Sequence, residues 1–548
     1  MSDRAAARLV GLQAFTIAFL VLIANGRPIG SGDTNAMERT VGSLVEHGTV
    51  VQPDPKTPDP FTAPVPGGRV SIYPVLPALL ATPLFFAFGL FFDLNPAGLQ
   101  VAGKLSAALL AAVATAIMAH SYSRRTSSRL ALGSALLFGL GTSVYSTSQA
   151  LWQHPAVVLF MVLALDALAR VETAASSDRL RPGLVASLCL SLAAVSRPAA
   201  IPISAALFAF LLFRARSHAA RLVGVACVPA VFVAVYNTYF FGAPWRFGPG
   251  LAGRFLSAFP ESIAGLLVSP ARGLIVFTPI ALIAMLGLIA AARRLRLARA
   301  LLFAVFIHFV FVAAWNEWHG GESFGPRLLT DMLPALFFYL PEALLAAPAT
   351  GAALGVLSVL IQLLGGWTYD YRWERLHQRG QQFDDALWSW RDSPLVFAVR
   401  EGVVIQGGLD LDGRRLRARV HRSVPFGPEG SVVDATARGL RVSGESLIRD
   451  VRLERGARID AGWMSLAHPA DAVAFRSVSA GDLSLHLVGS LQGVVSVETQ
   501  EGSTATPTTG DFDITVPLRL ETRGDVYVRA QTGELRLGRL EVRSVHRP

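Results

Sequence analysis

The stretch "IYPVLPALLATPLFFAFGLFF" (72–92) decides how this chain is threaded through a membrane. It is apolar throughout and long enough to cross a bilayer, which takes about 20 apolar residues. If it crosses, every later connection changes sides. The reading of the whole chain therefore depends on whether this one stretch is a span.

The composition places the chain among polytopic membrane proteins. It has 548 residues, 52% of them hydrophobic, and a mean hydropathy of +0.45. Its net charge of +10 comes from short basic clusters between apolar runs, as in membrane proteins, so we expect no nucleic-acid partner. The two cysteines lie inside apolar runs and form neither a disulfide framework nor a metal-ligand spacing. No cluster of His, Cys and carboxylate residues has a convincing metal-ligand spacing, and no P-loop or dinucleotide fingerprint follows a strand. We therefore predict no metal site and no cofactor.

Eleven further apolar runs are candidate spans. The first lacks a small-residue cleavage site, so we interpret it as a retained helix rather than a signal peptide. The runs are 9–25, 98–119, 128–147, 154–170, 182–196, 199–213, 220–240, 275–291, 300–315, 328–347 and 350–366.

Arginine placement favours a non-crossing 72–92. The connections at 124–129, 170–181, 214–221 and 293–299 are rich in arginine. If 72–92 does not cross, all four face the cytoplasm together with the N-terminus, as the positive-inside rule requires. We predict a helix lying along the outer face or dipping into it. The alternative is a true span with an external N-terminus.

The remaining connections then lie on the extracytoplasmic side. They are rich in Trp, His, Tyr, Gly and Pro, as expected if a functional site lies on that face. We predict three regions: a transmembrane catalytic domain over 1–370 (with a first external loop at 26–97), a connector over 371–399 and an extracytoplasmic β-sandwich over 400–548. Period-two segments such as "DLSLHLVGSL" (482–491) indicate its strands. We predict a loop at "GSTATPTTG" (502–510). The β-domain is either carbohydrate-binding or a structural lid or interaction domain.

The first external loop contains "SGDTNAMERTVGSLVEHG" (31–48), whose apolar spacing predicts an amphipathic helix. Gly48 is suited to end it, and Asp33 or Thr34 to cap its start. On position alone, Asp33 is explained as a helix cap. A catalytic carboxylate is the competing interpretation.

A short first helix, then "GD…R…SL…G", a Pro-rich loop and "YPVLPALLATPLFFAFG" resemble the GT-C superfamily of polyprenyl-phosphate-sugar-dependent glycosyltransferases, such as protein O-mannosyltransferases, aminoarabinose transferases and arabinofuranosyltransferases. The resemblance covers roughly the first 370 residues. It implies that Asp33 is the general base. Many members have Asp-Glu where this chain has Asp33-Thr34, so Asp54 or Asp59 is a candidate second carboxylate, or none is needed.

The chemistry requires an acidic residue and, for the leaving phosphate, hydrogen-bond donors from Arg, Lys, His or amide groups. An acceptor hydroxyl is a poor nucleophile until a positioned carboxylate takes its proton, which gains roughly 10²–10⁴ in rate. The lipid phosphate leaves as an anion and needs donors aimed at it.

The loop "WNEWHGGESFGPRLL" (315–329) supplies the richest set of candidates. Its glycines permit close backbone approach, and an arginine grips phosphate with two donors. The alternative is an interfacial aromatic belt with a tight turn. The loop's candidates are Arg327 and His319 for the donor phosphate, and Trp315, Trp318 and Glu322 for the substrate pocket.

Further candidates lie in other external segments. Arg197 in an apolar zone and Arg69 before the surface helix are candidate phosphate ligands. Tyr73, His154 and Asn237 are candidate pocket residues, although each is also suited to hydrogen-bonding a helix end.

The sequence thus predicts an inverting glycosyltransferase of the bacterial inner membrane, with a cytoplasmic N-terminus and an external β-domain. Its donor would be a polyprenyl-phosphate sugar, and its acceptor a glycan, lipid or protein of the cell envelope. A lipid-glycan flippase, a non-catalytic scaffold and a ligase using a diphosphate donor are the alternatives. The chain shows no repeat of the kind that transporters carry.

Overall fold

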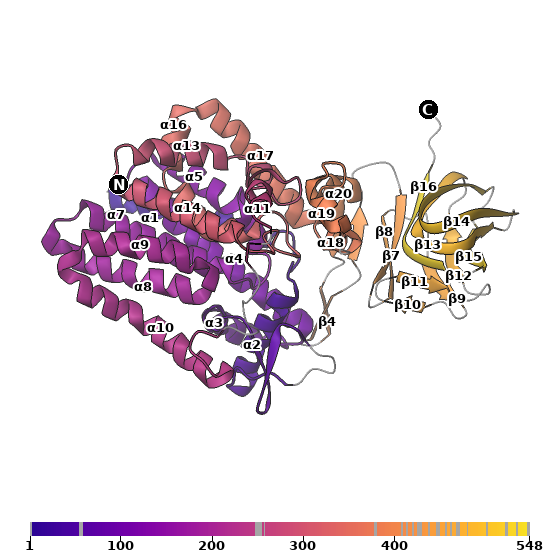
Figure 1. The fold of residues 1–548 in the computed structure, drawn as a ribbon, viewed down its shortest axis with the longest axis horizontal. Helices are drawn as coiled ribbons and strands as arrows, with labels where there is room; N and C mark the ends of the chain where they lie inside the picture. Colours follow the sequence, from indigo (N-terminus) through magenta and orange to yellow (C-terminus); the bar gives the residue numbers. More distant parts are fainter. Residues whose placement is uncertain are drawn as a thin grey trace. The chain divides into compact units, whose positions relative to one another are not determined.

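The structure, a computed structural model, describes residues 3–53, 59–246, 255–256, 258–377 and 381–406, and beyond these the strands of the C-terminal part. Two units are distinguished: residues 1–395 with 409–418, and residues 396–408 with 419–548. The first is helical and the second is built of strands (Figure 1).

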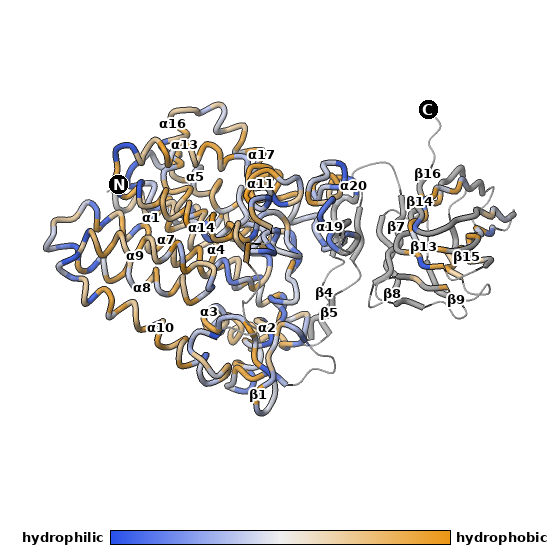
Figure 2. Tube along the Cα trace, in the orientation of Figure 1, coloured by the Kyte–Doolittle hydropathy of each residue, from blue (hydrophilic) through white to orange (hydrophobic). Residues whose placement is uncertain are grey.

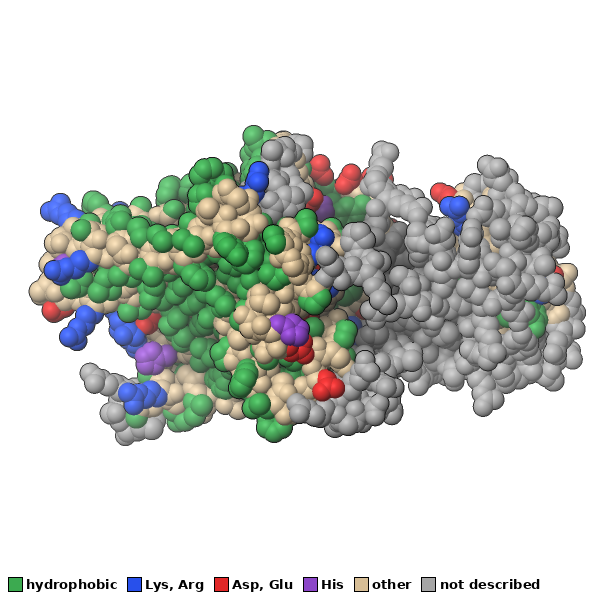
Figure 3. Space-filling view, turned by 90° about the horizontal axis from the view of Figure 1, so that it is seen from below, with side chains coloured by type: hydrophobic (Ala, Val, Ile, Leu, Met, Phe, Trp, Pro, Cys, Tyr) green, Lys and Arg blue, Asp and Glu red, His purple; other side chains and the backbone are tan. Residues whose placement is uncertain are grey.

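Long apolar helices form the first unit, and hydropathy follows them closely (Figure 2). Arginine and lysine side chains gather toward one end of this unit in the face shown by Figure 3. Besides the helices between α1 and α4, which are described below, its helices are α1 (Asp3–Ile23), α4 (Pro96–Ser123), α5 (Ser128–Leu140), α6 (Ser143–Thr147), α7 (His154–Thr173), α8 (Leu180–Ser196), α9 (Ile201–Arg214), α10 (Ala219–Phe241), α11 (Glu261–Val268), α12 (Leu274–Phe277), α13 (Ala281–Ala292), α14 (Arg296–Ala313), α15 (Leu333–Phe337), α16 (Leu340–Ala346), α17 (Pro348–Thr368), α18 (Arg372–His377) and α19 (Gln381–Trp388). The helix α20 (Pro394–Glu401) begins in the first unit and continues into the second.

Within the described residues, six helices are long and apolar enough to cross a membrane, and a bent pair makes a seventh candidate. The chain is therefore a multi-pass helical membrane protein, but the structure does not confirm the predicted count of eleven. The bent pair runs from 327 to 346 and turns by 71°. It begins as a 3-10 helix, η4 (Arg327–Met332). Prolines at 334 and 341 interrupt the apolar run there, because proline lacks the N–H that a continuous helix needs.

The segment between α1 and α4 folds as α2 (Gly32–His47), a hairpin of β1 (Thr62–Val65) and β2 (Gly68–Ser71), and α3 (Leu76–Gly89). With 14 residues, α3 is roughly 21 Å long and too short to cross a hydrocarbon core of about 30 Å. Its apolar face packs on α2, where Met37 and Val41 meet Ala81 and Phe85. The stretch 72–92 thus ends in a helix that does not qualify as a span.

The ends of α2 correct one prediction and confirm another. Ser31 is the N-cap residue, and Asp33 lies in the first turn, so neither Asp33 nor Thr34 is the cap. Gly48 ends the helix in the left-handed conformation (φ 68°), as predicted. The Asp33 carboxylate is therefore not needed to satisfy the helix end.

The second unit contains a sheet of ten strands folded over one core. The long strand β13 (Gly481–Thr499) pairs with β14 (Gly502–Leu520) along its whole length. Its other edge pairs first with β16 (Leu535–Ser544) and then with β15 (Gly524–Thr532), so the sheet divides into two halves. The remaining strands of the sheet are β7 (Gly430–Thr436), β8 (Gly439–Gly444), β9 (Asp450–Glu454), β10 (Arg458–Asp460), β11 (Trp463–Leu466) and β12 (Ala472–Val478).

Alternate residues of both halves meet in one buried cluster, which is the packing of a β-sandwich. Leu485 and Leu487 of β13 and Val526 and Val528 of β15 belong to it. The predicted loop at 502–510 is wrong, because these residues are the first part of β14. Threonine is β-branched and suits a paired strand. A separate two-stranded sheet of this unit pairs β3 (Val403–Gln406) with β6 (His421–Val424). The strands β4 (Leu409–Asp412) and β5 (Arg415–Ala418) pair with each other and belong to the first unit.

Candidate functional site

The first turn of α2 and the start of η4 bring Asp33 and Arg327 together. Arg327 Nη1 donates to Asp33 Oδ2 at 3.0 Å, across 294 residues of sequence. Both side chains are mostly buried, with 14% of Asp33 and 17% of Arg327 exposed. Ser31 donates its hydroxyl proton to the other carboxylate oxygen of Asp33. The structure thus joins the predicted base to the predicted phosphate ligand.

The arginine is held from two sides. Its guanidinium lies over the ring of Trp152, with the carbon 4.3 Å from the ring centroid. Gly320 (φ 77°) contacts its stem, and Gly321 (φ 63°) follows in the same left-handed conformation, which favours glycine. Arg327 Nε is buried and has no hydrogen-bond partner within the part of the chain that the structure describes. The guanidinium therefore retains a donor for a ligand.

Tyr73 lies close enough to Asp33 and Arg327 for their charges to act on it. Burial is the main cause that raises the pKa of Tyr73, and the Asp33 carboxylate raises it further. Its ring stacks with Phe61 at 6.3 Å between centroids. The phenol therefore stays protonated and offers one O–H donor beside the pair.

Two other predicted residues meet at an acid that the sequence did not single out. Asp331 is fully buried; it accepts from His154 Nδ1 at 2.9 Å with one oxygen and pairs with Arg197 through the other. His308 lies within range of the same carboxylate. Arg197 thus balances the buried charge of Asp331, and His154 forms a hydrogen bond to the same carboxylate. A role for either residue toward substrate stays a prediction.

His319 is uncharged at neutral pH. Burial, and then the charges of Arg272 and Arg327, lower the pKa of His319 to about 4. Its Nδ1 accepts from the backbone N–H of Gly321 at 3.1 Å, which leaves Nε2 as the donor. As a phosphate ligand, His319 would supply one neutral hydrogen bond and no positive charge.

The two tryptophans of this loop pack into the protein. Trp318 is 4% exposed and lies against Gly265, where a Cβ would come within 2.1 Å of the ring. Trp315 meets Phe255 edge to face at 5.1 Å. Neither ring lines the pocket described below.

Arg69 and Asn237 each form hydrogen bonds to a residue close in sequence. Arg69 crosses the hairpin to bind Thr62, with Nε 2.7 Å from its hydroxyl and Nη2 2.8 Å from its carbonyl. Asn237 donates to the carbonyl of Pro244 at 3.2 Å, beside the end of α10. The structure joins neither of them to Asp33.

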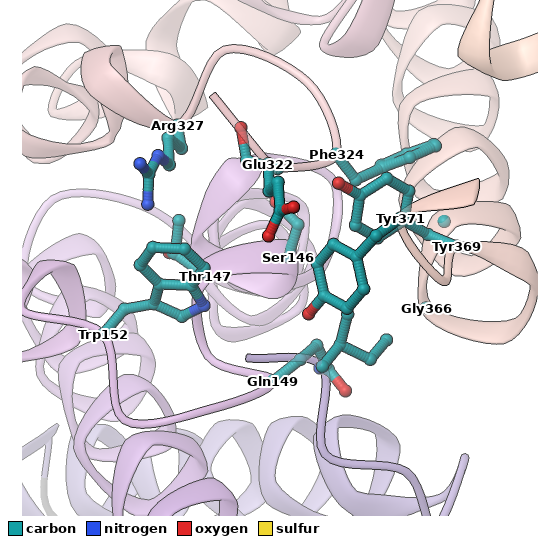
Figure 4. Close-up of a pocket in the computed structure, with 13 residues that line it drawn as sticks. Ser146, Thr147, Gln149, Trp152, Glu322, Phe324, Arg327, Gly366, Tyr369 and Tyr371 are labelled. Atoms are coloured by element: carbon teal, nitrogen blue, oxygen red, sulfur yellow. The ribbon is translucent and has the colours of Figure 1, made fainter. Parts of the chain in front are cut away.

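A narrow pocket adjoins Arg327 (Figure 4). Arg327 and Trp152 lie on one side of it, and Phe324, Tyr369 and Tyr371 on the other. Glu322, the fifth candidate from the 315–329 loop, extends its carboxylate into the space between them. Of these pocket residues, the sequence analysis identified only Arg327 and Glu322, both from the 315–329 loop. It did not identify Trp152, Tyr369 or Tyr371.

The second carboxylate near Asp33 is Glu38, one and a half turns further along α2. It is 2% exposed, and burial raises its pKa to about 8, with the Asp33 charge as a smaller contribution in the same direction. Glu38 is therefore mainly protonated at neutral pH. Of the two carboxylates considered from sequence, Asp59 pairs with Arg39, and Asp54 lies outside the described residues.

A buried ion pair fixes the loop that precedes Arg327. Arg272 is fully buried; its Nε donates to the carbonyl of His319 at 2.9 Å and its Nη2 to that of Gly321 at 3.0 Å. The same Nη2 meets Glu374 at 2.8 Å. Arg272 thus anchors the backbone of the loop that leads to Arg327.

Among the residues that the structure describes, no group of three His, Cys, Asp or Glu side chains could hold a metal ion. The absence of a metal site stays a prediction from the sequence. The arrangement at Asp33 offers carboxylate, guanidinium and phenol groups, which suits proton transfer and anion binding.

No family model matches the chain, and no curated protein matches it. Among solved structures, it is similar to the Archaeoglobus fulgidus oligosaccharyltransferase AglB in complex with an inhibitory peptide and a dolichol-phosphate, with 13% identity, 70% of this chain and 60% of that chain covered, and a TM-score of 0.41. It is also similar to the arabinosyltransferase EmbB from Mycobacterium smegmatis, with 11% identity, 98% and 64% covered, and a TM-score of 0.37. The chain spans less than two thirds of either protein.

Proposed function

We propose that the protein is an inverting membrane glycosyltransferase that moves a sugar from a polyprenyl-phosphate donor to a hydroxyl acceptor. The observation that carries this proposal is the contact between Asp33 and Arg327, at 3.0 Å and mostly buried. The transfer needs a base to take the proton of the acceptor hydroxyl and an anion ligand for the leaving phosphate, and Asp33 and Arg327 are suited to these two roles.

The arginine has enough donors for two tasks. A guanidinium carries five N–H groups. One of those on Arg327 holds Asp33, and the N–H at Nε is buried without a partner in the described chain. A donor phosphate can therefore bind Arg327 without displacing the carboxylate, and the phosphate then draws on the charge that otherwise stabilises ionised Asp33.

The reaction forms one bond and breaks one. The acceptor oxygen attacks the anomeric carbon from the face opposite the phosphate, while its proton passes to Asp33. The bond between that carbon and the phosphate oxygen breaks, and the electron pair leaves with the polyprenyl phosphate. Arg327 stabilises this anion, and the sugar inverts at the anomeric carbon.

The test is transfer from a panel of radiolabelled polyprenyl-phosphate sugars into membrane glycans, lipids and protein. We expect one donor to be consumed and Asp33→Asn to lose two or more orders of magnitude in rate. The matched control is Glu46→Gln, an exposed carboxylate on the same helix, which should transfer like the unaltered protein.

An Asp33→Asn variant that transfers normally would remove the base from this position. If no donor is consumed at all, a flippase or a scaffold becomes the better explanation. The acceptor class is read from where the label arrives.

A further inference from the structure

A buried acid lies four residues beyond Arg327 in η4. From its contacts we infer that Asp331 is a positioning residue, which through His154 holds Arg327 over Trp152, where the guanidinium can meet the donor phosphate. The inference rests on the proposed function, because it names a further residue on which that transfer depends.

The element that carries Arg327 depends on contacts from outside. η4 (Arg327–Met332) runs for six residues, and 3-10 helices longer than about four residues are uncommon because their hydrogen bonds are poorly aligned. Its buried polar contacts come from other helices. His308 Nε2 of α14 lies 3.4 Å from the carbonyl of Leu328, and the hydroxyls of Thr330 and Ser143 of α6 share a hydrogen bond of 2.8 Å. Contacts with its surroundings therefore fix the course of η4.

Asp331 makes the charged contacts of this element. It is fully buried; one carboxylate oxygen pairs with Arg197, which follows α8, and the other lies 2.9 Å from Nδ1 of His154. Since an arginine beside it favours the ionised carboxylate, the imidazole nitrogen is the donor. Hydrogen bonds to an ionised group are stronger than neutral ones. The link between η4 and His154 is therefore a charge-assisted hydrogen bond inside the protein.

His154 connects this contact to the ring beneath Arg327. Trp152 lies two residues before His154, and its ring centroid is 4.3 Å from the guanidinium carbon of Arg327. Along η4, Arg327 and Asp331 are separated by about 8 Å, from a rise of about 2 Å per residue. Two residues of chain span at most about 7 Å. Two contacts of similar spacing thus join the same two segments, and the contact at Asp331 sets where the other one forms.

The position of Arg327 matters because its donors have separate tasks. Nη1 holds Asp33 at 3.0 Å, and Nε is buried without a partner among the described residues, so it is available to the phosphate. A misplacement of about 1 Å can lower a rate by about 10². Arg272 anchors the loop before Arg327, and Asp331 anchors the helix that begins at it. Arg327 is thus fixed from both directions of the chain.

The test asks whether His154 acts through Arg327. His154 is altered rather than Asp331, because loss of the acid would leave Arg197 without its partner. The full-length protein is purified in detergent, and kcat/KM for sugar transfer is measured for His154→Leu, Arg327→Lys and the double variant. We expect His154→Leu to lower kcat/KM of the unaltered protein by about 10- to 100-fold, the effect of one hydrogen bond to a charged group. In Arg327→Lys the same change should cost less than about 3-fold, because the side chain that it positions is already lost.

Two further variants separate positioning from stability. His154→Asn places an amide nitrogen at the same number of bonds from Cβ as Nδ1, so it should keep the hydrogen bond to Asp331 and retain kcat/KM within about 3-fold. Ser187→Ala removes a buried hydrogen bond to the carbonyl of Leu222, between α8 and α10. As a change in stability alone, it should alter kcat/KM by the same factor in the unaltered protein and in Arg327→Lys.

A binding measurement separates this inference from the enzyme. Binding of radiolabelled undecaprenyl phosphate, the class of leaving group in the proposed reaction, is measured on the same proteins without any sugar. We expect His154→Leu to weaken binding in the unaltered protein and not in Arg327→Lys. This coupling, with no sugar transferred from any donor, supports the positioning of Arg327 and removes the enzyme. Transfer that depends on Asp33, with equal losses from His154→Leu in both backgrounds, does the reverse.

Three results would overturn the positioning role. His154→Leu could lower kcat/KM by the same factor with and without Arg327→Lys, it could change neither transfer nor binding, or His154→Asn could be as impaired as His154→Leu. If the protein neither transfers a sugar nor binds undecaprenyl phosphate, both proposals fall, since Arg327 then has no anion to receive.

Discussion

Gly320 lies directly against Arg327: a Cβ on the glycine would be 3.2 Å from Cγ of the arginine and 3.4 Å from its Nε. Gly320 also has a φ of 77°. We expect Gly320→Ala to cost about 1 kcal/mol or more in stability, because alanine is strained at this φ, and to lower kcat/KM by displacing Arg327 from Asp33. Thermal unfolding and initial transfer rates test both effects.

Gly133→Ala is the control for this variant. Gly133 lies within α5, and a Cβ there would meet nothing within 4 Å. Alanine favours a helix over glycine by up to about 1 kcal/mol, so this variant should be as stable as the unaltered protein or slightly more so. Equal transfer by Gly320→Ala and Gly133→Ala would show that the position of Arg327 does not depend on the glycine.

Arg327→Lys tests whether the forked guanidinium matters or only its charge. Lysine carries one point charge, so it cannot hold Asp33 and a phosphate through separate fixed donors, nor lie flat on Trp152. We expect kcat/KM to fall by about 10², the loss seen when one donor to a developing anion is removed. Arg129→Lys, at an exposed arginine near the start of α5, should leave the rate unchanged. A lysine variant with normal kinetics would reduce Arg327 to a source of positive charge.

Local sequence patterns predicted where helices form, but they did not predict where an apolar run is broken. The run over 328–347 is apolar enough for a span, yet its prolines break it into η4, α15 and α16. Hydropathy counts apolar residues and does not register where the backbone must bend, so the number of spans was not determined by it. The ending of α2 at Gly48 was predictable because it depends on that residue's own conformational freedom.

Contacts within the candidate site were also not predictable from local sequence patterns. The sequence identified Asp33 and Arg327 separately, each from its own loop, but nothing periodic links positions 294 residues apart. Asp331 escaped notice because an acid inside an apolar run has meaning only through His154 and Arg197, which reach it from elsewhere in the chain. Tyr371 lies in the predicted connector, and its left-handed φ of 67° cannot be predicted from composition.

Glu38 makes stability depend on pH in a defined direction. Its pKa rises on folding from an ordinary 4.5 to about 8, so the folded state holds a proton that the unfolded chain has lost. That contribution is fully present below about pH 4.5 and disappears as pH rises through 8. We expect Glu38→Gln, which cannot ionise, to lose less thermal stability than the unaltered protein between pH 5 and pH 9. Glu46→Gln, exposed on the same helix, should show the same pH dependence of thermal stability as the unaltered protein. If all three proteins show the same pH dependence, protonation of Glu38 does not contribute to folding stability.

Arg272→Met should destabilise the protein and disorganise the site at once. It leaves Glu374 buried without its cation, which costs about 3–5 kcal/mol. It also removes the donors to the carbonyls of His319 and Gly321. As a comparison, Arg170→Met breaks an ion pair whose arginine is half exposed and should cost no more than about 1 kcal/mol.

The double variant Arg272→Met/Glu374→Met separates stability from positioning. Two apolar side chains leave no unpaired charge, so the unfolding temperature should recover much of what the single variant lost. The carbonyls at 319 and 321 remain without their donor, so the loop that carries Arg327 is still unanchored. We therefore expect transfer to stay low while stability returns. If transfer returns as well, the buried pair serves stability alone, and the loop before Arg327 finds its conformation without it.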